Sequence, residues 1–290
     1  MTLSHYRSGR KLPQENKSKL SISTLLLLKD LFNFKGWDID ENDDISYFNR
    51  YAKTLANLNE QQQDFFLDLT SRFVHIPAYM YLDKLIQPLK NLRTEDPNAE
   101  LLFACCLPKE DIGSTKSAHI VLYNLKGSLI KTKINLRPSR VIDKWDEKNL
   151  DFLRKPNTNV VLVDDFIGTG DTALAAIDYI QELNPLIDKR QINILCIVTM
   201  KEGMERLLQN GYKIYPSIIM EKGITDYFEG EDYDNAIKNM QIIESTIKRL
   251  RYRFRFGYLR SEALVCMERC PNNTFPIYWK TPQIAPYERG

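Results

Sequence analysis

The sequence predicts an α/β fold with a mainly parallel sheet. Short apolar runs bounded by turn residues recur between residues 101 and 220, and amphipathic segments separate them. Strands that alternate with helices form right-handed βαβ units, whose parallel sheet is covered on both faces. The composition agrees, because 43% hydrophobic and 27% charged residues are typical of a chain that buries a core.

The first third of the chain is predicted to be helical, because its apolar residues recur on a helical period without β-branched alternation. Asn59 stands where it can cap the third of these helices. The 290 residues exceed the usual domain size of about 100–150. We therefore divide the chain into a helical N-terminal region, 1–98, and an α/β domain with a smaller C-terminal segment, 99–290. The helices expected in the first region are 20–34, 45–58, 61–74 and 79–92.

The α/β domain is predicted to alternate strands with helices, and to end in a turn with an aromatic anchor at 271–279. Polar loops are expected at 108–117 and 137–158. The expected strands are 101–107, 129–136, 160–163, 192–200, 212–220 and 262–267. The expected helices are 118–125, 171–183, 202–209 and 233–250.

Charge and composition exclude several classes of protein. With 40 Lys and Arg against 38 Asp and Glu, the net charge of +2 argues against a protein that coats nucleic acid. No apolar run approaches the roughly 20 residues of a membrane span, and no secretory signal is seen. Five cysteines without a C-x-x-C pair and three histidines leave little material for a zinc site. We expect a cytoplasmic protein with reduced thiols and no membrane partner.

The most informative segment is residues 160–172, VVLVDDFIGTGDT. A buried strand is followed by two acids, Asp164 and Asp165, at the end of a parallel sheet where ligands bind. A turn with Gly168 and Gly170 then opens a helix. Glycines and helix N-terminal N–H groups bind phosphate, and threonine hydroxyls add donors. A βα turn with incidental acids is the alternative, whereas a Walker loop and a dinucleotide fingerprint are absent.

The two acids indicate what lies beside the phosphate. Carboxylates repel a phosphate, but they accept hydrogen bonds from sugar hydroxyls or bind a divalent cation. The segment therefore predicts a site for a sugar phosphate, with the sugar diol on one side and the phosphate on the other.

This segment resembles the phosphoribosyl diphosphate (PRPP) motif of type I phosphoribosyltransferases. Phe166 is bulkier than the usual aliphatic residue, and Gly168 replaces a small polar residue or alanine. Together with Gly257-Tyr258, the strand 263–265 and the segment 271–274, it is similar to the phosphoribosyltransferase-like effectors of bacterial conflict and anti-phage systems, including some retrons. The resemblance covers roughly residues 100–280.

The resemblance implies a role for several residues. Asp164 and Asp165 would hold the ribose hydroxyls of PRPP bound with Mg²⁺, and no residue is assigned as a direct metal ligand. A separate hood would read the acceptor, with Tyr258, Phe275, Tyr278 and Trp279 as candidates either for base stacking or for a core edge. The 5′-phosphate loop would be Gly168, Thr169, Gly170, Asp171 and Thr172. The pyrophosphate loop would contain Lys109, Ser114, Thr115 and Lys116, and a flexible loop would carry Arg137 and Arg140.

A second informative segment is residues 248–260, in which arginines alternate with apolar residues. As a strand, it would present its arginines on one face and its aromatic residues on the other. Arginine arrays bind phosphate backbones and aromatic rings stack on unpaired bases. An edge strand protected by charge is the alternative. The arginines expected to contact nucleic acid are Arg249, Arg251, Arg253 and Arg255.

Three functions follow as hypotheses. The first is a phosphoribosyltransferase, that is, a glycosyltransferase that transfers or cleaves a ribosyl group as an anti-phage effector. The second is a catalytically silent sensor that binds PRPP or a nucleotide. The third is a regulatory subunit tethered to nucleic acid or to a reverse transcriptase–DNA complex. The acceptor and the oligomeric state stay open.

Overall fold

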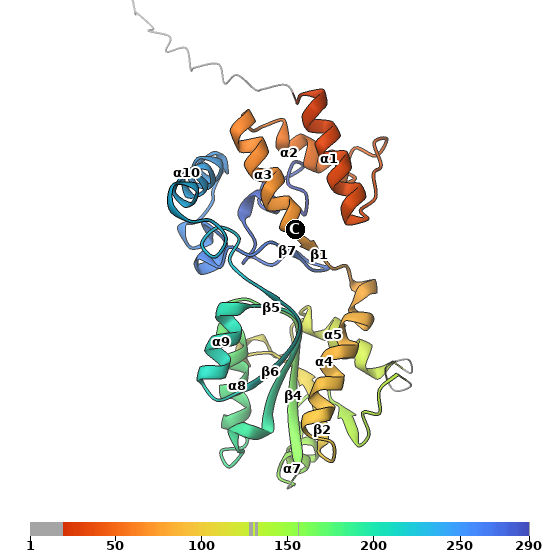
Figure 1. Cartoon of the computed structure of the whole chain (residues 1–290). Coiled ribbons are helices and arrows are strands. Elements are labelled where there is room, and N and C mark those ends of the chain that lie inside the picture. Colours follow the sequence, from red (N-terminus) through yellow and green to blue (C-terminus); the bar gives the residue numbers. More distant parts are fainter. Residues whose placement is uncertain (1–19, 128–129, 131–132, 156, 290) are drawn as a thin grey trace, which may run out of the picture.

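The computed structural model describes residues 20–127, 130, 133–155 and 157–289, and it arranges them in two lobes (Figure 1). The sheet lobe runs from residue 81 to 220. The terminal lobe is assembled from the two ends of the chain, residues 20–75 and 224–289, which share one hydrophobic cluster.

The sheet lobe confirms the predicted α/β class. Its described residues form a five-stranded parallel sheet in the order β3-β2-β4-β5-β6. Val163 of β4 lies level with Cys105 of β2 and Leu195 of β5. The strands are β2 (Glu100–Cys105), β3 (Ser139–Val141), β4 (Thr158–Ile167), β5 (Ile192–Met200) and β6 (Lys213–Met220).

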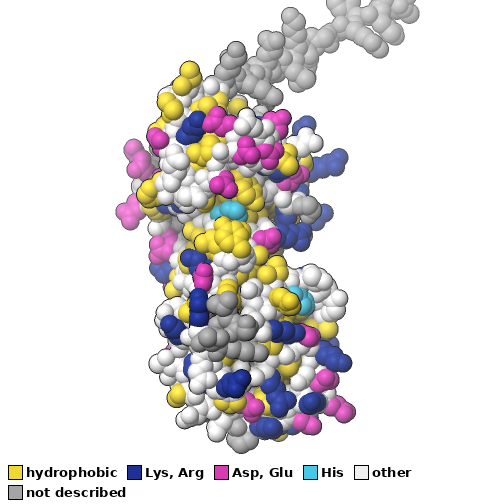
Figure 2. All heavy atoms as spheres, turned by 90° about the vertical axis from the view of Figure 1, so that its right-hand side faces the viewer, with side chains coloured by type: hydrophobic (Ala, Val, Ile, Leu, Met, Phe, Trp, Pro, Cys, Tyr) yellow, Lys and Arg dark blue, Asp and Glu magenta, His cyan; other side chains and the backbone are white. Residues whose placement is uncertain are grey.

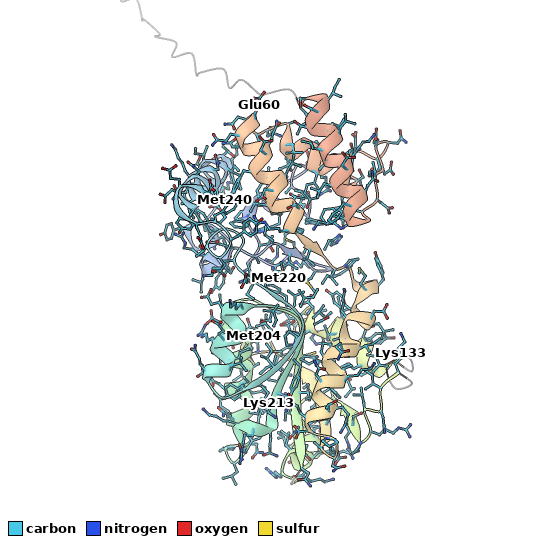
Figure 3. All side chains as sticks on the ribbon, viewed as in Figure 1. Glu60, Lys133, Met204, Lys213, Met220 and Met240 are labelled. Carbon is cyan, nitrogen blue, oxygen red and sulfur yellow. The ribbon has the colours of Figure 1, made fainter. Side chains whose placement is uncertain are left out.

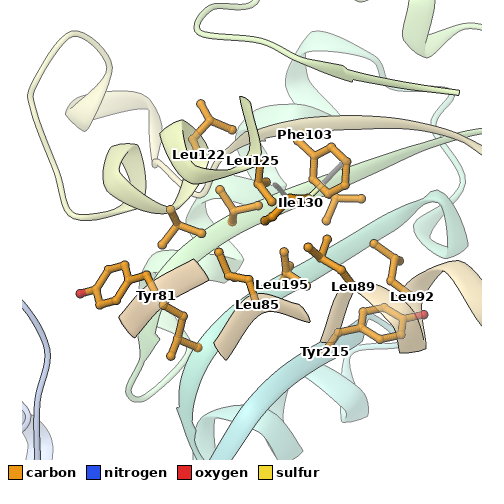
Figure 4. Packing of buried hydrophobic residues seen from close by; sticks show 14 of the residues in the cluster. Tyr81, Leu85, Leu89, Leu92, Phe103, Leu122, Leu125, Ile130, Leu195 and Tyr215 are labelled. Carbon is orange, nitrogen blue, oxygen red and sulfur yellow. The ribbon is translucent and has the colours of Figure 1, made fainter. Parts of the chain in front are cut away.

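Helices cover both faces of this sheet (Figure 1). Because side chains alternate along a strand, Val161 and Val163 face one core while Val160 and Leu162 face the other. In the first core, leucines of α4 pack against Phe103 and Leu195 (Figure 4). The helices of the first face are α4 (Tyr81–Glu95) and α5 (Ala118–Lys126), and those of the second are α7 (Glu147–Leu153), α8 (Asp171–Leu183) and α9 (Lys201–Gln209).

The terminal lobe packs helices around an aromatic core. Asn59 caps α3 in a capping box with Gln62, as predicted. Phe275, Tyr278 and Trp279 are buried in the core, so the structure favours the core reading of these three residues. The elements are α1 (Ile22–Lys35), α2 (Tyr47–Leu55), α3 (Glu60–Arg72), α10 (Gly230–Thr246) and the parallel pair β1 (Val74–His75) and β7 (Val265–Cys266).

The carboxyl ends of the sheet strands face the terminal lobe. Met220, the last residue of β6, packs against the clusters of both lobes and lies where the lobes meet (Figure 3). α4 lies within the range of the N-terminal helical region, 1–98, but it packs on the sheet. A ligand at this edge therefore has both lobes within reach.

The predicted strand at 129–136 is wrong where the structure describes it. Ile130 and Lys133 are helical, and the N–H of Ile134 donates to the carbonyl of Ile130. Residues 128, 129, 131 and 132 lie outside the described residues. A short apolar run does not distinguish a strand from a buried helix, and Ile130 is buried in the first core. The edge strand is β3, in a segment expected to be a loop.

The predicted strand of alternating arginines is also wrong. Tyr252–Phe254 is a 3-10 helix, and Arg249 has a φ of 57°. The N–H of Phe256 donates to the carboxylate of Glu244 at 2.7 Å instead of pairing with a strand. The predicted strand 262–267 is reduced to β7, and α10 ends at Thr246 instead of residue 250.

Charged side chains of both signs are intermixed on the face shown in Figure 2, which agrees with the nearly balanced charge of the sequence. In the part of the chain that the structure describes, no helix has the length and apolar character needed to cross a membrane.

Candidate functional site

The two acids lie at the carboxyl edge of the sheet, but inside β4. This strand continues to Ile167, beyond the predicted end at Val163. β4 lies beside β2 because the chain first leaves β2 for the edge strand β3 and then returns to the centre. The strand order therefore reverses between β2 and β4, which is where open α/β sheets bind their ligands.

The acids differ in environment, since neighbouring residues of a strand point to opposite faces. Asp165 is only 3% exposed, and it accepts a hydrogen bond from the Tyr81 hydroxyl at 2.8 Å. Asp164 is half-buried and accepts from the Ser117 hydroxyl at 3.4 Å and from the Asp165 N–H at 2.9 Å. Burial and the neighbouring carboxylate raise the pKa of Asp164 well above its usual range. Asp164 is thus the acid that is available to a ligand.

Tyr81 connects this acid pair to the terminal lobe. Its hydroxyl donates to Asp165 and accepts from the N–H of Glu268 at 3.1 Å. The Glu268 carboxylate in turn accepts from the N–H of Ala78 at 2.9 Å. Tyr81 is fully buried at the start of α4, so this chain of hydrogen bonds holds Asp165 in a fixed position.

Replacing Tyr81 with phenylalanine is expected to destabilise the protein by about 1–3 kcal/mol, the usual cost of leaving a buried polar group unpaired. The substitution removes the donor to Asp165 and the acceptor for Glu268 while keeping the ring. Urea unfolding measures the change. Tyr123→Phe, on an exposed ring of α5, is the matched control and should leave the unfolding free energy unchanged. Equal stability of the two variants would contradict the assignment.

The glycine-containing loop after β4 opens α8 as predicted. Gly170 adopts a φ of 84° at the N-cap, a conformation that favours glycine. No side chain caps this helix, so the N–H groups of its first turn are open to a ligand. Such a turn favours an anion, because its N–H groups and the helix dipole both point to it.

The side chains of the loop are braced by α9. The Thr169 hydroxyl donates to the Asp171 carboxylate at 2.9 Å. Arg206 donates to the carbonyl of Thr169 at 3.1 Å and forms an ion pair with Asp171. This pair neutralises the carboxylate within a loop that is otherwise suited to an anion.

A cavity of about 390 Å³ lies between this loop and the terminal lobe. One wall is the loop from Phe166 to Ala173, which belongs to the sheet lobe. The other wall belongs to the terminal lobe and consists of Arg253, Phe254, Tyr258, Asn272 and Asn273. Tyr258, a candidate for base stacking, thus lines the cavity.

The residues expected to bind pyrophosphate do not converge on the acids. Lys109 pairs with Glu182 at 2.7 Å, near the far end of α8 from the loop. Lys116 pairs with Asp111 at 2.8 Å, and the Ser114 hydroxyl donates to the carbonyl of the same residue. The described contacts of the acids include neither Thr115 nor either lysine; the loop contributes Ser117 instead.

The arginines expected in the flexible loop lie toward the amino ends of the strands, away from the two acids. Arg140 of β3 is level with Leu102 of β2, and its guanidinium lies 4.3 Å from the centre of the Phe152 ring. Arg137 precedes β3 and so lies farther still from the carboxyl edge.

The arginines expected to bind nucleic acid are all exposed, in a turn instead of a strand. Arg253 lines the cavity, whereas Arg249, Arg251 and Arg255 do not.

Sequence reasoning missed Tyr81, Ser117, Arg206 and Asn273. The sequence contains one signal for Asn273, because Gly168 stands where the motif of type I phosphoribosyltransferases has a small polar residue or alanine. A Cβ at Gly168 would lie 2.3 Å from Nδ2 of Asn273. In the described part of the chain, no group of three or more His, Cys, Asp or Glu residues is arranged to hold a metal.

The parallel sheet and its acid-to-glycine loop define a phosphoribosyltransferase-like fold. The family model PRTase-CE matches residues 54–286, and the chain belongs to this family. The crystal structure of orotate phosphoribosyltransferase from Aeropyrum pernix is similar at 18% identity, over 49% of this chain and 70% of that chain, with a TM-score of 0.28. No curated protein matches.

Proposed function

We propose that this protein binds PRPP or a related ribosyl phosphate, and that it transfers or cleaves the ribosyl group. The observation that carries the proposal is the continuity of β4, the loop and α8. A half-buried carboxylate and an uncapped helix N-terminus stand a few residues apart at the edge where the strand order reverses. A carboxyl group that accepts hydrogen bonds and an anion-binding helix N-terminus suit the hydroxyls and the phosphate of one sugar phosphate.

In this proposal, each residue of the site has a separate task. Asp164 accepts hydrogen bonds from the ribose hydroxyls, Asp165 is held by Tyr81 and fixes the strand end, and the loop N–H groups bind the 5′-phosphate. The bond between the anomeric carbon and pyrophosphate breaks with its electron pair on pyrophosphate. The acceptor then forms the new bond to that carbon and loses a proton, and water as acceptor gives hydrolysis.

Mg²⁺ fits this site as an ion carried by PRPP. Mg²⁺ is usually bound by one or two carboxylates together with substrate phosphates, and Asp164 supplies one such carboxylate. When bound, Mg²⁺ would neutralise part of the negative charge on pyrophosphate.

A sensor that binds without turnover is the second candidate, and one observation favours it. The lysines expected to stabilise departing pyrophosphate, Lys109 and Lys116, are paired with acids away from Asp164. Release of pyrophosphate from PRPP with Mg²⁺, measured across nucleobases, nucleotides and nucleic acids, distinguishes the candidates. Turnover with any acceptor supports the enzyme, and binding without turnover supports the sensor.

We also propose that the site serves an effector of a bacterial anti-phage system, as the resemblance to retron-associated proteins suggests. In this role, exposed arginines such as Arg249 and Arg251 would contact nucleic acid or a reverse transcriptase–DNA complex. Such binding weakens steeply with salt because phosphate contacts release counterions. Binding that is indifferent to salt would exclude the tether.

Asp164→Asn is expected to lower the affinity for PRPP about tenfold, because the amide NH₂ replaces one acceptor oxygen and a typical hydrogen bond contributes about 0.5–1.5 kcal/mol. The same change is expected to raise the unfolding temperature at pH 7. The folded pKa of Asp164 lies above its unfolded value, so ionisation costs stability as the pH rises above about 4. The gain should therefore shrink as the pH falls toward 4.

Isothermal titration calorimetry and thermal unfolding measure the two effects on one preparation. Asp178→Asn, at an exposed position of α8, is the control and should leave both the affinity and the pH dependence unchanged. Wild-type affinity in Asp164→Asn would exclude the ribose role, whatever the stability shows.

A further inference from the structure

The terminal-lobe wall of the cavity carries side chains that suit an anion. We infer that Arg253 and Asn273 complete the phosphate site, so that one phosphate monoester is held by both lobes at once. The inference rests on the proposed function. It adds that binding requires residues from the terminal lobe, which the loop and α8 do not contain.

Asn273 provides the first line of support. It is 8% exposed, and its amide lies directly against Gly168, where a Cβ would come within 2.3 Å of Nδ2. Its backbone carbonyl is fixed, because it accepts from the Ser261 hydroxyl at 2.9 Å and from the Ala263 N–H at 3.1 Å. Within the described residues, its side-chain amide has no hydrogen-bond partner. An amide N–H at this position can donate to a phosphate oxygen in the loop.

Arg253 provides the second line of support. Its guanidinium is exposed at the cavity and lies 4.9 Å from the centre of the Phe254 ring. No carboxylate of the described part of the chain pairs with it. Arg206, the other arginine near the loop, is occupied by Asp171. Arg253 therefore supplies the positive charge that a phosphate monoester, with a charge of about −1.5 to −2, requires.

The backbone holds these side chains in one rigid wall. The N–H of Tyr258 donates to the carbonyl of Asn272 at 2.8 Å. A Cβ at Gly257 would lie 1.9 Å from the carbonyl oxygen of Asn273, so the two segments are in direct backbone contact. Left-handed backbone is concentrated here and costs energy in residues other than glycine. It occurs at Phe256, Gly257, Leu259, Arg260 and Glu262.

The chemistry selected is a phosphate monoester, either on a free sugar or at the 5′ end of an oligonucleotide. Titration of the full-length protein with ribose 5-phosphate, and separately with oligonucleotides that carry a 5′-phosphate or a 5′-hydroxyl, distinguishes the two sources. Preference for ribose 5-phosphate identifies the free sugar. Preference for the 5′-phosphorylated oligonucleotide identifies the nucleic-acid end.

Two variants test the residues. Arg253→Gln and Asn273→Asp are each expected to weaken binding of ribose 5-phosphate about 10- to 100-fold, since one loses a charged donor and the other places a carboxylate against the phosphate. Lys248→Gln and Asn235→Asp change the charge of the same lobe equally, at exposed positions outside the cavity, and should bind as the wild type does. Thermal unfolding verifies that each variant is folded. If Asn273→Asp does not fold, Arg253→Gln still tests the inference, because Arg253 is exposed.

The outcomes separate this inference from the proposed function. Loss of binding in the two variants, with wild-type affinity in both controls, supports the shared phosphate site. Equal affinity in all five proteins overturns it and leaves the proposed function intact. Failure of the wild type to bind both ribose 5-phosphate and the 5′-phosphorylated oligonucleotide overturns the proposed function, and the inference with it.

Discussion

Replacing Gly203 with alanine is expected to displace the phosphate loop, to weaken binding of ribose 5-phosphate at least about tenfold, and to destabilise the protein by about 1–3 kcal/mol. In an ordinary helix, this substitution would be stabilising by up to about 1 kcal/mol. Here a Cβ would lie 2.1 Å from the carbonyl oxygen of Gly168 and 3.3 Å from the N atom of Gly170. Both neighbours are backbone, so the loop itself must move.

Urea unfolding and calorimetric titration of Gly203→Ala measure these effects. Glu205→Ala, at an exposed position on the same helix, should retain the affinity and stability of the wild type. If Gly203→Ala gained stability as helix propensity predicts and bound with full affinity, the close approach of α9 to the loop would be disproved.

Glu244→Gln is expected to stabilise the protein at pH 8 by up to about 3 kcal/mol. Glu244 is 1% exposed, and burial raises its pKa from 4.5 to about 7. Because the folded pKa is the higher one, the protein loses stability as the pH rises from about 4.5 through 7. One carboxylate oxygen accepts from the Phe256 N–H, and the other is buried without a partner. Glutamine keeps the first contact and removes the charge.

Urea unfolding at pH 4 and pH 8 tests this prediction. The difference between Glu244→Gln and the wild type should be large at pH 8 and nearly absent at pH 4. Glu231→Gln, exposed on the first turn of α10, is the control and should show no such dependence. A stability difference that is the same at both pH values would rule out ionisation of Glu244 as the cause.

The part of the site that follows one strand could be predicted from the sequence. The run from Val160 to Thr172 combines an apolar strand, acids and glycines in a local order, and α8 begins at Asp171 as expected. The continuous apolar run from Val160 to Val163 was also sufficient to predict a strand buried on both faces. Local signals of this kind do not depend on where the rest of the chain lies.

Arg253 and Tyr258 were candidates from the sequence, but the position of their wall opposite the loop could not be predicted, because it depends on contacts between distant residues. Asn273 meets Gly168, and Tyr81 meets Glu268, only through the docking of the lobes. The arginine segment was predicted to be a strand because its alternation has period two. The buried carboxylate of Glu244 and the left-handed backbone of the segment override that pattern.

The terminal lobe has a consequence for how the chain acquires its shape during synthesis. Leu28, Phe32 and Phe66 are made before the sheet, yet they share one hydrophobic cluster with Phe275 and Tyr278, which are made after it. The sheet lobe, which lies between these segments in the sequence, can fold first. Until the C-terminal segment is made, the apolar faces of the N-terminal helices remain uncovered. The ligand cavity therefore forms only after the sheet, and a chain made only as far as β6 carries the loop without the opposite wall of the cavity.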